Sequence, residues 1–211
     1  MTSDVQGIVI LLIVLLFSMS IHEMMHAFAA DWLGDDTARL QGRLTINPVA
    51  HIDPIFTVAL PLLLLLSHAG FLFGAAKPVQ VNFNRLRYGA LGGAIVGAVG
   101  PLTNLFIAAV AAILFNHYQP AQGTTAYSIY AITIMLNSGL FIFNSIPWPP
   151  LDGSRVLYAV APRPVQELME SIERMGVVGL VIFVFLFYSF GNTLGDLIVR
   201  FVHLMAPTLN L

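Results

Sequence analysis

The chain has 211 residues, of which 57% are hydrophobic and only 9% are charged, and its formal net charge is −2. Soluble domains carry about 25% charged residues, so this composition predicts a protein of the lipid bilayer. The absence of cysteine excludes disulfides and thiolate metal sites, and without a long basic run nucleic acid is not an expected partner.

Apolar segments follow one another along the chain, and a helix needs about 20 such residues to cross a bilayer. We expect an all-α polytopic membrane protein, a single transmembrane domain over residues 1–211, with about five hydrophobic segments. The first follows an acidic start without a basic region, so we expect it in the mature protein. A charged stretch at 164–174 predicts a short interfacial helix. The five segments are 7–32, 55–73, 88–115, 127–146 and 176–205.

The stretch between the first and third segments is harder to assign. Residues 33–54 mix charged residues with alternating apolar ones, so a strand is as plausible there as coil. We therefore expect a small β or re-entrant element in this part of the chain.

The first segment contains His22-Glu23-Met24-Met25-His26, an H-E-x-x-H pattern. Residues four apart share one face of a helix, so both imidazoles can bind one zinc ion, with Glu23 beside them as general base. Ionisable groups inside a membrane span are costly unless they have partners, which favours a functional site here.

A catalytic zinc usually has three protein ligands, so one more is needed. Asp152 follows the fourth segment, after prolines that end the helix. Taken alone, Asp152 before Gly153 is an ordinary turn pair.

Together, His22 to His26 and the N-x-x-P-x-P-x-L-D-G sequence at 144–153 resemble the site-2 protease family of intramembrane zinc metalloproteases, peptidase family M50. The similarity extends to 47–51 and 100–104 and covers about residues 7–160, with the interfacial helix and the last span beyond it at about 164–205. It resembles a minimal form without PDZ or CBS domains.

The resemblance implies specific roles for residues of this chain. His22, His26 and Asp152 would bind one Zn²⁺ per chain, and Glu23 would be the general base. Asn144 would help to hold the substrate or the oxyanion. Asn47 and His51 are candidates for a second layer around the site, with His51 equally readable as a plain loop histidine. Asn104 is expected to bond between helices.

A shared metal also restricts the topology. The end of the fourth segment must lie on the same side as the end of the first, so 33–88 begins and ends on one side. The segment at 55–73 then turns back, at Pro61 or within 70–81, although a full crossing is not excluded. Nearly all Lys and Arg fall on the metal side, which predicts a cell (inner) membrane protein with its active site towards the cytoplasm.

The predicted function is therefore hydrolysis of peptide bonds in transmembrane protein substrates near the cytoplasmic face, as in regulated intramembrane proteolysis. The alternatives are a membrane metal transporter, a metal-binding protein, and a zinc hydrolase of a non-peptide substrate. An inactive relative is disfavoured by the intact motif. Substrate, cleavage site, regulation, pathway and oligomeric state stay open.

Overall fold

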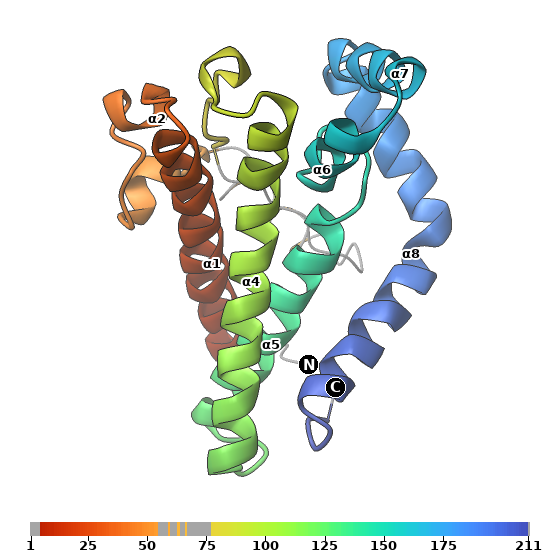
Figure 1. Cartoon of the computed structure of the whole chain (residues 1–211). Helices are drawn as coiled ribbons and strands as arrows, with labels where there is room; N and C mark the ends of the chain where they lie inside the picture. Colours follow the sequence, from red (N-terminus) through yellow and green to blue (C-terminus); the bar gives the residue numbers. More distant parts are fainter. Residues whose placement is uncertain (1–4, 55–58, 60–62, 64–65, 67–76, 211) are drawn as a thin grey trace.

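The computed structural model describes residues 5–54, 59, 63, 66 and 77–210. Long helices dominate this part of the chain, and shorter ones gather at one end of the bundle (Figure 1). The long helices are α1 (Val5–Trp32), α4 (Ala90–Tyr118), α5 (Thr125–Asn144) and α8 (Val177–Met205). The shorter elements are α2 (Thr37–Leu40), η1 (Pro48–His51), η3 (Phe83–Arg85), α6 (Gly153–Val160) and α7 (Arg163–Arg174).

Four of the five predicted hydrophobic segments correspond to long helices, and the predicted interfacial helix corresponds to α7. The segment at 55–73 lies almost entirely outside the described residues, as do 70–76 of the proposed turn. Helix α6 was not expected, because the Asp152-Gly153 pair suggests a turn. Instead the chain begins a new helix immediately after Asp152.

The expected β element is not found in the described part of the chain, which contains no strand. The stretch 33–54 forms α2 and the 3₁₀ turn η1 instead. Pro48 starts η1, and the Asn47 side chain caps it by accepting from the Val49 N–H at 3.1 Å. Proline at a first helical position and an Asn cap outweigh the alternating apolar pattern here.

The topology agrees with the one that a shared metal requires. The Arg87 N–H donates to the Leu33 carbonyl at 2.8 Å, so the start of α4 lies against the end of α1. Helix α5 runs back antiparallel to α4 (Figure 1). The turn between them is formed by Gln119 in a left-handed conformation and by Thr124, which caps α5. The two ends of the stretch 33–88 therefore lie at the same end of the bundle, while its position relative to a membrane stays a prediction.

Helix α4 is central to the packing, because it contacts α1, α5 and α6. Its first half, beside the short helices, buries mostly glycine, with Val96 and Asn104. Its second half packs apolar side chains against α5 and α8 around Phe115, Ile134 and Val202. The two ends of one helix are thus held by different interactions.

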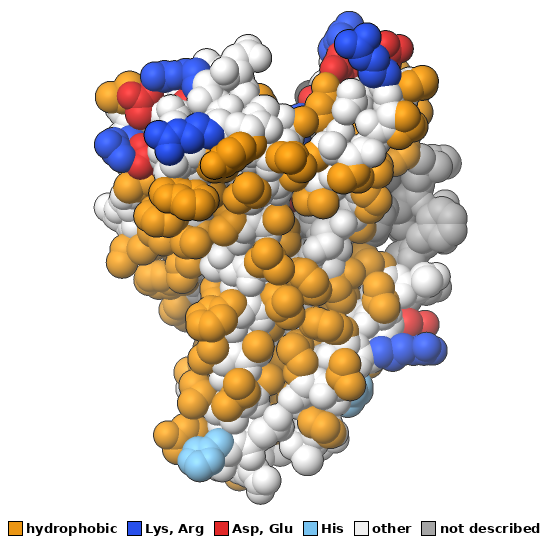
Figure 2. Space-filling view, in the orientation of Figure 1, with side chains coloured by type: hydrophobic (Ala, Val, Ile, Leu, Met, Phe, Trp, Pro, Cys, Tyr) orange, Lys and Arg blue, Asp and Glu red, His pale blue; other side chains and the backbone are white. Residues whose placement is uncertain are grey.

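The outer surface is apolar along the flank of the bundle, while charged side chains gather at the end that carries α2 and α7 (Figure 2). Large hydrophobic side chains such as Phe17, Phe106 and Ile113 are more than half exposed. Among the described residues, α1, α4 and α5 are long and apolar enough to cross a membrane. The chain is therefore a membrane protein, and a crossing by α8 stays a prediction.

Candidate metal centre

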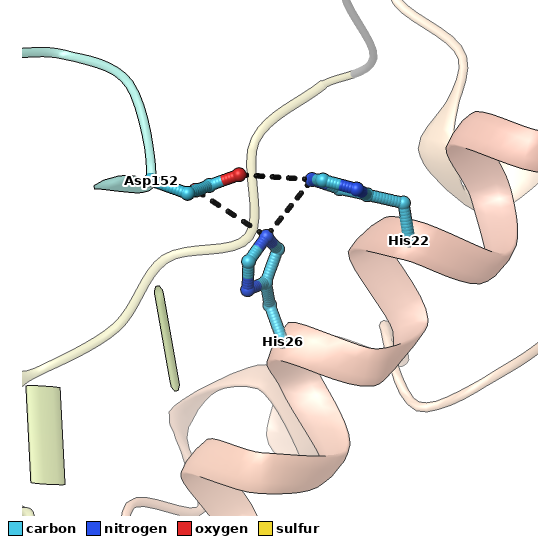
Figure 3. Close-up of side chains that lie close together, drawn as sticks. All are labelled: His22, His26 and Asp152. Atoms are coloured by element: carbon cyan, nitrogen blue, oxygen red, sulfur yellow. Dashed lines mark hydrogen bonds and ion pairs between the residues drawn. The ribbon is translucent and has the colours of Figure 1, made fainter. Parts of the chain in front are cut away.

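His22, His26 and Asp152 come together at the end of the bundle where α1 finishes (Figure 3). The histidines lie one turn apart on α1, and Asp152 reaches them from the start of α6. The Nε2 atoms of the two histidines are 3.0 Å apart. Asp152 Oδ2 lies 3.1 Å from His22 Nε2, and Asp152 Oδ1 lies 3.4 Å from His26 Nε2. The sequence predicted this ligand set, and the fold brings it together.

The other ring nitrogen of each histidine is already engaged. His26 Nδ1 contacts the Val96 carbonyl at 2.6 Å, and His22 Nδ1 contacts Asn104 Oδ1 at 2.5 Å. Both partners are acceptors, so both Nδ1 atoms carry the proton and both Nε2 atoms present a lone pair. Two lone pairs and a carboxylate facing one another need a cation between them.

The spacing of these atoms fits zinc. Bonds of about 2.0–2.1 Å in a tetrahedron place neighbouring ligand atoms about 3.3 Å apart. The separations here, from 3.0 to 3.4 Å, fall around that value. Two histidines and one carboxylate leave a fourth position open, which is the arrangement of catalytic rather than structural zinc sites.

Two glycines of α4 make the approach possible. A Cβ atom at Gly100 would lie 2.4 Å from His26 Nε2, and one at Gly97 would lie 2.8 Å from the backbone oxygen of Asp152. Real Cβ contacts are never that short. Small residues in membrane helices permit such close packing. Here they allow α1 and α6 to meet against the same face of α4.

Asp152 sits at the first position before α6, yet its side chain does not cap that helix. It points to the histidines instead (Figure 3). To bind a metal ion, the Asp152 carboxylate would be ionised.

Helix α6 is in turn fixed by Arg155. Its guanidinium lies 4.4 Å from the centre of the Phe83 ring and pairs with Glu173 of α7 at 2.8 Å. Arg155 therefore links α6, which begins at Asp152, to both η3 and α7.

Glu23 is half-buried, and its Oε2 accepts a hydrogen bond from the Val79 N–H at 2.9 Å. Residues 77–82 form no helix or strand. This segment is tied down by the bond from Lys77 N–H to the His51 carbonyl at 2.9 Å. A backbone donor thus orients the carboxylate that the motif assigns as general base.

The other predicted residues are not part of the ligand cluster. Asn144 donates to the Leu140 carbonyl of its own helix at 3.0 Å. His51 is fully buried, and its Nε2 contacts the Thr45 carbonyl at 2.9 Å. With Asn47 capping η1, these two residues shape the loop beside the site. Their roles towards the substrate or the metal stay predictions.

Sequence reasoning missed part of the surroundings of His22. Asn104 was expected to bond between helices, and it does, but one of its partners is the metal-ligand histidine itself. Two further residues were not identified from the sequence. Asn137 accepts a hydrogen bond from Asn104, and Ser18 accepts one from Asn137. The available signal was polar side chains within apolar helices, which need buried partners.

The chain resembles several known proteins. It is 39% identical over 182 residues to a Bacillus subtilis protein named "Putative zinc metalloprotease YwhC", covering 82% of this chain and 80% of that protein. It is 31% identical over 139 residues to a Mycolicibacterium smegmatis protein named "Putative zinc metalloprotease Rip2", covering 65% of this chain and 52% of that protein. Rip2 of Mycobacterium tuberculosis strain H37Rv is 27% identical over 171 residues, which are 79% of this chain and 63% of that protein. No family profile and no solved structure matches. The names and the ligand cluster agree on zinc.

Proposed function

Because the chain belongs to the family of membrane zinc metalloproteases that includes YwhC of Bacillus subtilis, we propose that it is an intramembrane protease of the site-2 type. The observation that carries the proposal is the cluster of His22, His26 and Asp152 inside an apolar helix bundle. The cluster has the donor set of a catalytic zinc site, and Glu23 follows His22 directly.

The proposed reaction is hydrolysis of a peptide bond. Zinc, when bound, lowers the pKa of a water molecule and polarises the carbonyl that is attacked. Glu23 accepts the proton of that water and passes it to the leaving amine nitrogen. The bond from the Val79 N–H holds the Glu23 carboxylate in one orientation before the substrate arrives. Asn144, at the end of α5, is proposed to hold the substrate or the developing oxyanion.

The proposed substrates are transmembrane segments of other proteins. The flank of the bundle is apolar, so a substrate can approach through the bilayer (Figure 2). A helix hides its carbonyls in internal hydrogen bonds, so the substrate has to unwind near the site. The irregular segment 77–82 lies beside Glu23 and offers backbone groups to an extended substrate chain.

Charge supports an active site towards the cytoplasm, in the cell (inner) membrane. Figure 2 shows most Lys and Arg side chains at the end that carries α2 and α7. The ligand cluster lies at the same end, because it joins the later part of α1 to the start of α6 (Figure 1). Basic residues favour the cytoplasmic side of membrane proteins.

The test compares wild type with Glu23→Gln, both purified in detergent. Zinc content is measured first, and each protein is then incubated with a panel of single-span membrane proteins, with products identified by mass spectrometry. We expect about one zinc per chain in both proteins and cuts inside the span only with wild type, because Gln cannot accept the proton.

The other outcomes separate the alternatives. Zinc bound by both proteins without cleavage of any substrate would favour a transporter, a metal-binding protein or a hydrolase of another substrate class. Equal cleavage by wild type and Glu23→Gln would overturn the assigned role of Glu23.

A further inference from the structure

A buried chain of hydrogen bonds runs from His22 through three helices. Asn104 of α4 bonds His22 Nδ1 through Oδ1 and donates from Nδ2 to Asn137 Oδ1 of α5 at 2.9 Å. Asn137 Nδ2 donates to Ser18 Oγ of α1 and to the Thr133 carbonyl, each at 2.9 Å. We propose that Asn137 and Ser18 are positioning residues of the metal centre, which act on His22 through Asn104.

The direction of every bond in this chain follows from its far end. A main-chain carbonyl can only accept, so the Thr133 carbonyl requires Asn137 to present its Nδ2. Asn137 Oδ1 then faces Asn104, which must donate to it from Nδ2. Asn104 Oδ1 is left for His22 Nδ1, which must carry the proton. The His22 tautomer with a free lone pair on Nε2 is therefore set by the Thr133 carbonyl, which lies three hydrogen bonds away along this path.

The chain also closes a ring. Ser18 and His22 lie one turn apart on α1, so the path leaves α1 at His22, passes α4 and α5, and returns to α1 at Ser18. Asn104 and Asn137 are fully buried, and Ser18 is 4% exposed. Water cannot easily replace a missing partner in such a place, and an unsatisfied buried polar group is destabilising. The ring therefore fixes the three helices and the imidazole together.

Comparison with His26 shows why only His22 depends on the hydrogen bonds through Asn104 and Asn137. His26 Nδ1 donates directly to the main-chain carbonyl of Val96, so no side chain decides its tautomer. His22 depends on an amide group that could otherwise rotate by half a turn and present its Nδ2. Asn137 prevents that rotation. Partners of ligand histidines typically contribute about 10–100-fold to metal affinity.

The test measures the metal site itself, so it does not depend on the proposed substrate. Zinc affinity is determined by chelator competition in detergent, and the cobalt-substituted protein is examined by its visible absorption spectrum. In Asn137→Leu, an apolar side chain of similar size, the Oδ1 that accepts from Asn104 is lost, so Asn104 is free to rotate. In Ser18→Ala the acceptor on α1 is lost, whereas Ser18→Thr keeps the hydroxyl.

The chain offers matched controls. Ser20→Ala also removes a buried hydroxyl from α1, but that hydroxyl donates to Leu16 of its own helix. Ser138→Ala removes one from the residue next to Asn137, and Ser138 is equally buried. Both controls test whether any loss of buried polarity in these helices disturbs the site.

We expect zinc affinity to fall about 10–100-fold in Asn137→Leu and less in Ser18→Ala, with altered cobalt spectra in both. Ser18→Thr and both controls should stay within about twofold of wild type, below the range for partners of ligand histidines. Wild-type affinity and spectrum in both Ser18→Ala and Asn137→Leu would overturn the proposal. A loss as large in Ser138→Ala would overturn it too. If Asn137→Leu does not fold, Ser18→Ala against Ser20→Ala decides.

Discussion

The two ends of the continuous helix α4 are held in the bundle by different kinds of interaction. At the metal end, Gly97 and Gly100 let α6 and α1 approach the backbone, and Asn104 bonds a ligand histidine. At the opposite end, Ala112 and Phe115 pack with apolar side chains of α5 and α8. The metal end is held by close backbone contact and buried hydrogen bonds. The far end is held mainly by apolar packing, with one exposed hydrogen bond from Asn116 to the Met205 carbonyl at 2.7 Å.

The difference reflects the solvent of a membrane protein. Lipid tails are as apolar as a leucine side chain, so apolar contacts between helices bring little specificity. Small residues and buried hydrogen bonds supply it instead. We therefore expect substitutions at the metal end to damage the site strongly, whereas similar substitutions at the far end change stability mildly.

The largest effect is expected for Gly100→Ala. The new methyl would overlap the imidazole of His26, so zinc affinity should fall by about 100-fold or more, beyond the usual effect of outer partners. Gly139→Ala on α5 is the matched control, because its Cβ would meet only Ile198 at an ordinary 3.7 Å among the described residues. Isothermal titration with zinc measures both. Equal affinity in the two variants would contradict the close packing at Gly100.

A smaller effect is expected where the backbone holds Glu23. Val79→Pro removes the N–H that donates to Glu23, so kcat should fall about 10-fold, which is a part of the ~10²–10⁴ that acid–base catalysis supplies. Zinc content should not change. Val79→Ala keeps the N–H and should keep the wild-type rate. A similar rate loss in both variants would show that the side chain, not the N–H, matters.

Asp35 tests the loops that surround the metal end. Its buried carboxylate accepts hydrogen bonds from the Asn82 N–H at 2.6 Å and from the Thr37 N–H at 3.2 Å. These two bonds join α2 to the segment after residue 77. Asp35→Asn places an amide against these donors and should cost about 1–3 kcal/mol of unfolding free energy. Asp36→Asn breaks only an exposed ion pair with Arg85 and should cost at most about 1 kcal/mol. Denaturation in detergent compares them.

The same residue predicts a dependence on pH. Burial raises the pKa of the Asp35 carboxyl, but the hydrogen bonds from Thr37 and Asn82 together lower it by more. The net result is a pKa below the usual value. The stability that Asp35 contributes is therefore complete above about pH 4 and is lost as the pH falls through the lowered pKa. Above pH 4, the difference between wild type and Asp35→Asn should not vary through titration of Asp35.

The smallest effect is expected at the far end of α4. Ile134→Val removes one methylene from a fully buried side chain and should cost about 0.5–1.5 kcal/mol of unfolding free energy. Zinc affinity should be unchanged, because this core lies away from the ligands. A clear loss of zinc affinity would show that the two ends of α4 are coupled.

Much of this structure could be predicted from local patterns. Apolar length located α1, α4, α5 and α8, and the spacing of His22 and His26 placed both on one helix face. Asp152 required the paired motif, since an Asp-Gly pair alone indicates a turn. The β element was expected from alternation in 33–54, where Asn47 and Pro48 start a 3₁₀ turn instead. Local capping outweighed a weak periodic signal.

The sequence by itself located the long helices and predicted the histidine pair and Glu23, because these depend on composition and on spacing within one helix, whereas the prediction of Asp152 required the paired motif. Only the tertiary structure decided what surrounds them: the ring through Asn137 and Ser18, the Val79 N–H on Glu23, and the packing at Gly100. Such contacts join residues far apart in the chain. A glycine or a buried Asn has no local signature that names its partner, so its role appears only when the helices meet.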